Sequence, residues 1–310
     1  MTVLAAMRAR LAAFWSGDIA WSFRRSRLTM LAAAVTILLV GSAILAPWIA
    51  PTDPFDPAQV DLMNAELPPA WMADGDPRFV LGTDVQGRDM LSAMLYGSRI
   101  SIAVGAAAVG FAMLLGVTLG LVAGYLGGRV DAAIMRIADV QLSFPSILVA
   151  LLVHGILRGL LPASSREALS IYVLIVAIGL ADWVQFARTV RSRTLVERDR
   201  EYVQAARIIG RGPAAIMRAH ILPNVMSPVL VIACISLATA ILTEASLSFL
   251  GVGVPVTQPS LGTLIRIGNN YLFSGQWWMT VFPSITLSVL VLAVNILGDW
   301  LRDALNPLLR

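Results

Sequence analysis

The chain has 310 residues, of which 57% are hydrophobic and only 14% are charged, and its mean hydropathy is +0.77. Soluble domains carry roughly 25% charged residues, so this composition excludes an ordinary soluble domain and indicates an integral membrane protein. All 23 basic residues are arginine. Because a P-loop needs a lysine that reaches the β- and γ-phosphates, the chain lacks the residue for an ATP-hydrolysing site of its own. We therefore expect a non-enzyme without a resident cofactor or metal.

Six apolar runs are long enough to cross a hydrocarbon core of about 30 Å, so the sequence predicts an all-α membrane fold with six transmembrane helices. These runs cover residues 28–50, 100–125, 134–157, 171–186, 225–249 and 279–300. The basic segment 1–27 followed by this first apolar run is a pattern that secretory signal peptides also have. The run exceeds the 7 to 15 apolar residues typical of such peptides, so we interpret residues 28–50 as an uncleaved anchor.

Residues 51–98 connect the first two runs and contain six prolines. Prolines at this density oppose helix, so the segment is expected to form an outward-facing loop lobe with little regular helix. Its second half, FVLGTDVQGRDMLSAMLYGSRIS, has turn glycines at Gly82 and Gly87, and Asp89 stands at the start of an amphipathic run. A plain solvated connection is the alternative to a functional surface.

Polar side chains within the apolar runs of the remaining body, residues 99–302, are candidate functional residues because they are costly at membrane depth. Glu244 has no basic partner on its own helix, so it either lines a pathway or makes a structural hydrogen bond. Asp182 is a second pathway candidate, with pairing to Arg188 near the interface as the alternative. Asn295 is placed to bond across helices or to line the pathway.

Arginine is distributed unevenly between the two sides that six alternating spans create. Seventeen of the 23 arginines fall on the side of the N-terminus and six on the other. By the positive-inside rule both termini, including the tail 303–310, and a basic loop at 188–224 are predicted to be cytoplasmic. Arg136 lies three residues before Asp139, a helical spacing that predicts a structural ion pair.

The most polar helical stretch, EYVQAARIIGRGPAAIMRAHILPN, lies within that basic loop. Its pattern predicts a helix from Glu201, a break at Gly210, and a second short helix from Pro213 that ends before Pro223. Such a unit could be an interfacial helix bound to anionic membrane lipid, a solvated loop, or an element that docks on another protein. The residues alone favour membrane lipid and another protein equally as the binding partner of this stretch.

The same stretch resembles the EAA motif of permease subunits in binding-protein-dependent ABC importers. The residues that carry this likeness are Glu201, Ala205, Ala206, Gly210, Ile216, Leu222 and Pro223. The likeness extends over almost the whole chain and is strongest to the second permease of the dipeptide, oligopeptide and nickel branch. Further matching strings are LGTDVQGRDMLSAMLYGSRIS, GGRVDAAIMRIADVQLSFP, SLSFLGVGVPVTQPSLGTLI and GDWLRDALNP. Asn306, in the last string, stands where the family more often has aspartate.

The resemblance implies the type I ABC importer permease fold, with the 201–224 stretch as a coupling helix seated on an ATPase subunit. It also implies two ATPase subunits that bind ATP and Mg, a second related permease, and an extracytoplasmic solute-binding protein that delivers peptide. This binding protein is expected to meet the outward motif, whose residues are Gly82, Thr83, Asp84, Gly87, Arg88 and Asp89. The implied location is the bacterial cytoplasmic membrane, and no nucleic-acid partner is expected.

Other functions remain open at this point. An ATP-independent secondary transporter would need a cluster of intramembrane acids, and Glu244 and Asp182 give only weak support for one. A scaffold protein without transport activity would leave the pattern of the 201–224 stretch unexplained. Within the same branch, nickel, glutathione and opine-like solutes are alternatives to dipeptides and oligopeptides.

Overall fold

The computed structural model describes residues 18–56 and 58–304, and this part of the chain is helical, with no β-strand beyond an isolated bridge between Thr83 and Asp89. Most of the predicted end segments 1–27 and 303–310, and Asn306, lie outside the described residues. Five helical stretches are long and apolar enough to cross a membrane. They are Arg27–Ile44 (α3), Met90–Leu126 (α5), Ser170–Glu197 (α8), Pro213–Phe249, which includes α11 (Leu222–Phe249), and Trp278–Ala304 (α13).

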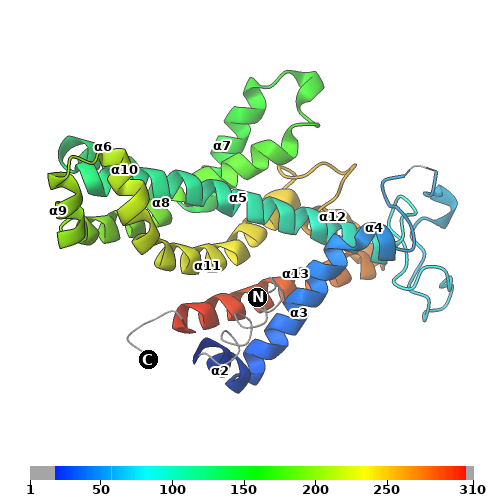
Figure 1. Ribbon diagram of the computed structural model, residues 1–310. Helices are drawn as coiled ribbons and strands as arrows, with labels where there is room; N and C mark the ends of the chain where they lie inside the picture. The colour runs from blue at the N-terminus through cyan, green and yellow to red at the C-terminus, as the bar shows by residue number, and fades with distance from the viewer. Residues whose placement is uncertain (1–17, 57, 305–310) are drawn as a thin grey trace.

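The predicted third span, 134–157, is not one straight helix. It is divided between α6 (Gly128–Leu142) and α7 (Ser146–Leu160), which are bent by 102° relative to each other. Pro145 lies at the break and cannot donate a backbone hydrogen bond, and its ring disfavours helical geometry in the residue before it. In Figure 1, α7 projects from the bundle together with the first part of α8, on which it packs, whereas α6 lies beside the end of α8.

The first span is formed by α3 and the short α4 (Ala46–Ile49), preceded by α2 (Asp18–Arg25). Ser26 caps α3 by accepting a hydrogen bond from the backbone N–H of Thr29 at 3.2 Å. In Figure 1, α3 and α13 run side by side at an angle to α5, α8 and α11. The Phe23 ring, on α2, meets the Trp300 ring of α13 edge to face at 5.2 Å. The α2 segment is thereby held to α13.

The most extensive helix pair is α5 with α8, which pack in parallel through glycines. A Cβ built on Gly116 would lie 2.5 Å from the Cβ of Phe186, and one on Gly120 would lie 2.5 Å from the backbone oxygen of Ala187. Gly124, one turn further, meets Thr194 in the same way at 2.7 Å. Small residues let helix backbones approach within a membrane, where van der Waals packing replaces the hydrophobic effect as the driving force.

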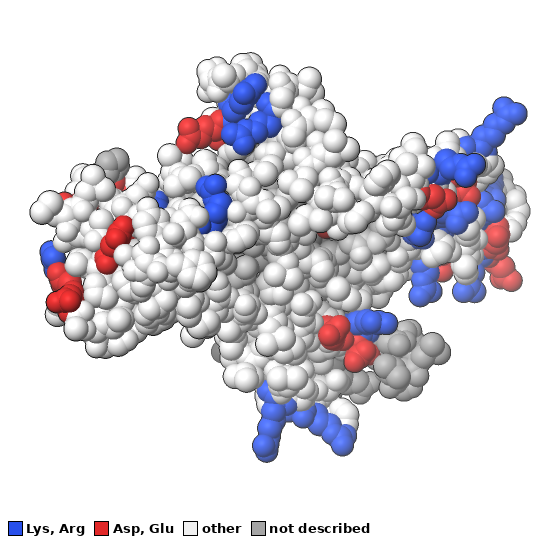
Figure 2. All heavy atoms as spheres, turned by 180° about the vertical axis from the view of Figure 1, so that it is seen from behind, with Lys and Arg blue, Asp and Glu red and all other residues white. Residues whose placement is uncertain are grey.

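The second half of the bundle joins α11 to α5, to α13 and to the short α12 (Leu261–Asn269). Gly262 on α12 would place a Cβ 2.4 Å from the backbone oxygen of Ala245, so α12 lies directly on α11. In Figure 2 charged side chains gather around the periphery, at both ends and on the projections at the top and bottom, and the centre of this face is mostly free of them. This pattern suits a body whose middle lies in hydrocarbon.

Candidate functional site

The stretch from Glu201 to Asn224 forms a compact helix-turn-helix, which we call the 201–224 unit. It consists of α9 (Glu201–Ile208), a turn, α10 (Pro213–Ile216) and a π-helical turn (Met217–Ile221) that leads into α11. The prediction that the second helix ends before Pro223 is wrong, because the helical stretch continues from Pro213 to Phe249. Gly210 has φ of 82° and ends α9: its N–H bonds to the Arg207 carbonyl at 2.9 Å, and the Arg211 N–H bonds to the Ala206 carbonyl at 3.1 Å. This is a Schellman motif, which requires the left-handed glycine predicted there.

Apolar side chains anchor the inner face of the 201–224 unit. Val203, Ile216 and Ile221 are fully buried, and Ala206 is 6% exposed. They belong to the same hydrophobic core as residues of α5 and α8. Two of the predicted coupling residues, Ala206 and Ile216, therefore hold the unit to the body of the protein.

Polar contacts fix the unit to α5 and α8, and one more closes the unit onto its own last residue, at the start of α11. The Arg207 guanidinium lies over the Tyr125 ring of α5 at 5.1 Å, and the Tyr202 hydroxyl donates to the Glu197 carboxylate at the end of α8. Asn224, in the first turn of α11, donates through Nδ2 to the Tyr202 hydroxyl at 3.1 Å. Partial removal of the phenol from water, and then its bond to Glu197, raise the pKa of Tyr202 above its ordinary value, which suits a hydroxyl that donates to a carboxylate.

The outer face of the unit is exposed and apolar at its tip. Ile208 is 87% exposed and Ile209 is 80% exposed, and Ala205 and Gly210 are also exposed. A polar hollow of about 690 Å³ lies at the other, N-terminal end of α9, and its walls are formed by Glu197, Asp199, Arg200, Glu201, Tyr202 and Asn224. Leu222 is half-buried and Pro223 is exposed at the start of α11. The two exposed isoleucines at the turn form an apolar surface suited to a protein partner.

The predicted ion pair between Arg136 and Asp139 is wrong. Asp139 is instead paired with Arg188 of α8, with 2.5 Å between Nη2 and Oδ1. Asp131 pairs with Arg191 of the same helix, and the second bond of that pair is 2.6 Å long. Asp139 turns toward the packed neighbour α8 because α6 lies across the end of that helix. This also removes Arg188 as a partner for Asp182.

Glu244 is enclosed at the junction of α5, α11 and α12. It is 0% exposed, and its Oε1 accepts a hydrogen bond from the Ser248 hydroxyl at 2.7 Å. The hydroxyls of Ser101 and Ser260 lie beside the same carboxyl. This placement corresponds to the structural-hydrogen-bond alternative and not to a side chain that faces an open path within this chain. The two other intramembrane candidates, Asp182 and Asn295, are half-buried.

The outward motif is a structural element of the lobe, which corrects the expectation that its residues face a soluble partner. Thr83, Asp84, Arg88 and Asp89 are at most 3% exposed. Arg88 forms an ion pair with Asp84 at 2.6 Å, and Asp89 caps α5 by accepting from the Ser92 N–H at 2.8 Å. The motif therefore shapes the lobe and starts the second span, and other residues must form any contact surface there.

Gly82 and Gly87 supply the tight turns of this motif, each with φ of 80°. A Cβ on Gly87 would also lie 2.1 Å from the backbone oxygen of Asp61. Thr83 ties the motif to the rest of the chain, because its hydroxyl donates to the Asn64 carbonyl at 2.6 Å and its own carbonyl accepts from the Trp278 indole at 3.1 Å. The lobe and α13 are thus joined through a buried hydrogen bond.

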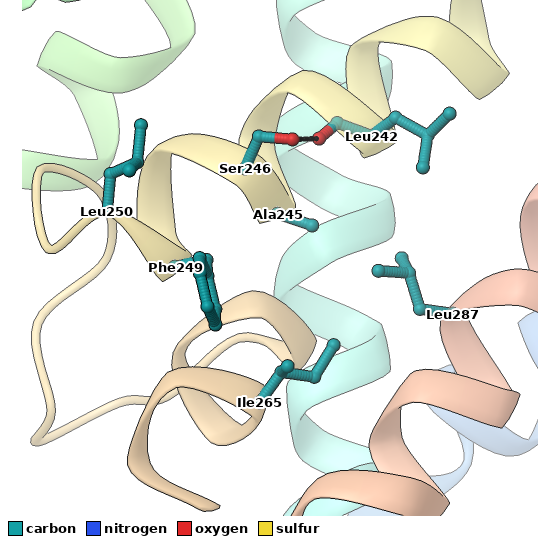
Figure 3. A pocket seen from close by; sticks show the side chains of 7 residues that line it. All are labelled: Leu242, Ala245, Ser246, Phe249, Leu250, Ile265 and Leu287. Carbon is teal, nitrogen blue, oxygen red and sulfur yellow. Dashed lines mark hydrogen bonds between the residues drawn. The ribbon is translucent and has the colours of Figure 1, made fainter. Parts of the chain in front are cut away.

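A second hollow, of about 330 Å³, opens between α11, α12 and α13 (Figure 3). Its walls are apolar apart from Ser246, whose hydroxyl donates to the Leu242 carbonyl at 2.8 Å. Within residues 18–56 and 58–304 no group of three or more histidine, cysteine or acidic side chains is placed to hold a metal ion.

Comparison with known families identifies the chain. Residues 116–310 match the family described as the binding-protein-dependent transport system inner membrane component. This match covers more than half of the chain. The chain belongs to this family. Residues 14–69 of the permease also match the N-terminal transmembrane domain of oligopeptide transport permease C.

Three curated relatives cover nearly all of the permease. The di/tripeptide transport system permease protein of Pseudomonas aeruginosa is 38% identical and covers 88% of this chain and 86% of its own length. The dipeptide permease of Haemophilus influenzae is 35% identical over 93% of both chains, and the oligopeptide permease of Bacillus subtilis is 36% identical over 94% of this chain and 90% of its own. The resemblance stated from the motifs is thus confirmed.

A solved structure agrees at the level of fold. A chain of the MetNI methionine ABC transporter, in inward-facing conformations, matches with a TM-score of 0.53 at 19% identity. The match covers 70% of this chain and 98% of the other. The predicted all-α fold of a type I importer permease is therefore confirmed.

Several functional contacts had no signal in the sequence. The contact between Arg207 and Tyr125 joins residues 82 positions apart, and the bond between Tyr202 and Asn224 spans a glycine break. Two of the three serines around Glu244, Ser101 and Ser260, come from other parts of the chain, whereas Ser248 is one turn away on the same helix. Helical spacing reports on neighbours within one helix, so contacts between elements that first meet in the folded bundle escape it.

Proposed function

We propose that this chain is the permease subunit of an ATP-driven importer that moves dipeptides or oligopeptides delivered by a solute-binding protein. The family match and the peptide-permease relatives support the substrate class. One observation carries the mechanism: the 201–224 unit is rigidly joined to α5, α8 and α11 but presents Ile208 and Ile209 outward. A partner that moves this tip must move three spans with it.

The unit acts as a lever between a separate ATPase and the membrane helices. ATP-driven closure of two ATPase subunits, which would hold ATP and Mg, pulls the unit of this chain toward that of a second, related permease. The spans then open outward to receive peptide, and hydrolysis returns them to the inward-open state. This is a two-state element whose equilibrium nucleotide biases. An ATP-independent transporter is less well supported, because Glu244 is enclosed by serines and forms no acidic cluster with Asp182.

Orientation follows from the arginine distribution. The 201–224 unit and both termini face the cytoplasm across the bacterial inner membrane, and the lobe at 51–98 faces the binding protein. Lipid surrounds the apolar band between the two ends, and an anionic leaflet would favour the same orientation.

The experiment that tests the proposal changes the exposed tip of the unit without touching its anchor. Ile208→Glu and Ile209→Glu place a charge where each side chain is at least 80% exposed, so folding of the chain should be preserved. With both changes we expect ATP-dependent dipeptide uptake by the reconstituted complex to fall at least tenfold and the ATPase subunits to stop co-purifying. Val196→Glu is the matched control, since Val196 is a 57% exposed apolar residue near the end of α8 and outside the unit.

The outcomes separate clearly. Loss of uptake together with loss of the ATPase subunits, with the control intact, supports a docking lever. Uptake by the unmodified complex in the absence of ATP would overturn the importer proposal. Normal uptake by the double variant would overturn the assignment of the docking surface to this unit.

A further inference from the structure

Asp182 is an acidic side chain at mid-membrane that the proposed lever does not use. It lies near the middle of α8, 12 residues after Ser170 and 15 before Glu197, which corresponds to roughly 18 Å and 22 Å along the helix. It is half-buried. Among the described residues it takes part in no ion pair, because Arg188 is engaged by Asp139. An unpaired carboxylate at this depth must face water, a cation or a partner chain, since hydrocarbon does not solvate it.

The other acidic side chains of the long helices are already committed or lie near helix ends. Glu244 is fully enclosed, and Asp131 and Asp139 are ion-paired. Glu197 accepts from Tyr202 at the end of α8. In the part of the chain that the structure describes, Asp182 is thus the acid at mid-span that remains reachable.

A second acceptor lies one turn along the same helix. Gln185 is exposed, and its Nε2 donates to the Ser236 hydroxyl of α11 at 2.8 Å. This bond holds the Gln185 side-chain amide in place. The amide oxygen Oε1 points away from the N–H that is bonded to Ser236 and remains free to accept a hydrogen bond. Residues three apart on a helix have Cβ atoms roughly 5–6 Å apart, so Asp182 and Gln185 lie on neighbouring positions. Ser236 is itself near the middle of α11, so the group lies at one depth on two spans.

A peptide carries a chemical group that matches this arrangement. Its α-ammonium has one positive charge and three N–H donors, and on entry to a low-dielectric path it loses water that must be replaced. A carboxylate beside a fixed amide oxygen supplies both the opposite charge and a second acceptor. The same pair would repel a peptide carboxylate, so it recognises the amino end.

We propose that Asp182 and Gln185, held by Ser236, form a subsite that receives the α-ammonium of the peptide as it crosses the middle of the membrane. This inference rests on the proposed peptide-import function and assigns one binding subsite within it. Asp182 contacts the substrate, Gln185 contacts it through Oε1, and Ser236 is a positioning residue.

The first test removes the charge without changing the size of the side chain. Asp182→Asn should lower ATP-dependent dipeptide uptake by the reconstituted complex at least tenfold, while peptide-loaded binding protein still stimulates ATP hydrolysis. Asp182→Glu should recover part of the uptake. Asp299→Asn, which removes an exposed carboxylate near the end of α13, is the control and should leave uptake within twofold of the unmodified complex.

The second test asks whether the position faces water and substrate. In a background with the single cysteine removed by Cys234→Ala, the Asp182→Cys variant should react with a water-soluble cationic thiol reagent, and transported dipeptide should slow the reaction. Ala177→Cys, at a fully buried position on the same helix, is the matched control and should stay unreactive.

The outcomes distinguish this subsite from the importer itself. Absence of ATP-dependent uptake in the unmodified complex would overturn the proposed function and the subsite with it. Normal uptake by Asp182→Asn, or an unreactive Asp182→Cys variant as expected for an ion pair with a second permease, would overturn the subsite and leave the importer standing.

Discussion

Gly210 shows how one residue sets the shape of the coupling surface. Its φ of 82° is strained for any residue with a Cβ, although no heavy atom lies within 4 Å of where that Cβ would be. Gly210→Ala should therefore cost about 1–2 kcal/mol through the backbone and not through a clash. We expect weaker co-purification of the ATPase subunits and lower uptake.

Gly212 provides the matched control two residues later. A Cβ added there would also meet open space, but the φ of Gly212 is −69°, which alanine adopts freely. Gly212→Ala should retain normal co-purification and uptake. Equal effects of the two substitutions would show that the left-handed turn is not what positions the tip.

Glu244 tests whether a buried carboxyl is needed for its charge or for its hydrogen bonds. Glu244→Gln keeps the size of the side chain and an acceptor for Ser248, so thermal unfolding in detergent should stay close to that of the unmodified chain. Glu244→Ala leaves buried hydroxyls without partners and should lower the free energy of unfolding by about 1–3 kcal/mol. If the glutamine variant unfolds as early as the alanine variant, the ionised form is required.

The sequence predicts least well which side chains contact each other in the folded protein. The position of Gly210 is predicted correctly because a left-handed helix end leaves a local signature. The pairing of Asp139 with Arg136 is wrong, since its true partner Arg188 is 49 positions away and is selected by how α6 crosses α8. The outward motif is recognisable as a motif, but its burial depends on the fold of the whole lobe.

At the scale of elements, the glycine contact between α5 and α8 is the feature most open to test. Gly120→Ala would push a Cβ to 2.5 Å from the backbone oxygen of Ala187 and 2.8 Å from the Cβ of Val190. Because neither atom can move without displacing α8, we expect a loss of about 1–3 kcal/mol in stability and a lower thermal midpoint in detergent.

Gly110→Ala is the control that tests whether the effect of Gly120→Ala comes from the contact between α5 and α8. Gly110 lies on α5, and no heavy atom is within 4 Å of the place that a Cβ would take. Gly110→Ala should be neutral or raise stability by about 0.5–1 kcal/mol, because alanine favours helix over glycine. A similar loss for both substitutions would mean that glycine serves α5 itself and not its packing on α8.

Most of the long helices are predicted by the apolar runs in the sequence, and the places where a helix breaks or changes form have physical causes. Five apolar runs appear as long helices, because the hydrocarbon thickness dictates their length. The run at 134–157 is broken beside Pro145, and the π-helical turn at 217–221 precedes Pro223, which has no N–H to continue a regular start of α11. A bend angle is set by neighbouring helices, so periodicity alone does not reveal it.

At the scale of the whole molecule, the permease has two polar ends joined by closely packed helices. One end holds the lobe around a buried Asp84–Arg88 pair, and the other holds the 201–224 unit. Between them, backbone contacts through Gly116, Gly120 and Gly124 make α5 and α8 move as one body. Under the proposed lever mechanism, we therefore expect a displacement at the unit to be transmitted along both of these spans.

The parallel packing of α5 and α8 decides how many times the chain crosses the membrane. Gly116, Gly120 and Gly124 meet residues of increasing number on α8, and the Arg198 guanidinium at the end of α8 donates to the Gly124 carbonyl at 2.9 Å. Both helices therefore end on the same side. The chain between them must return across the membrane, so the bent pair α6 and α7 counts as a span, and residues 18–56 and 58–304 contain six spans in total.

Cysteine labelling tests this topology in intact cells, again with Cys234→Ala as the background. Met63→Cys in the lobe and Ser164→Cys in the segment between α7 and α8 should react with a membrane-impermeant thiol reagent from outside. Ile208→Cys should react only after the membrane is opened, because the unit lies where most arginines are. If the Ser164→Cys variant instead behaves like Ile208→Cys, α6 and α7 re-enter on one side, and α5 and α8 could not then pack in parallel as they do.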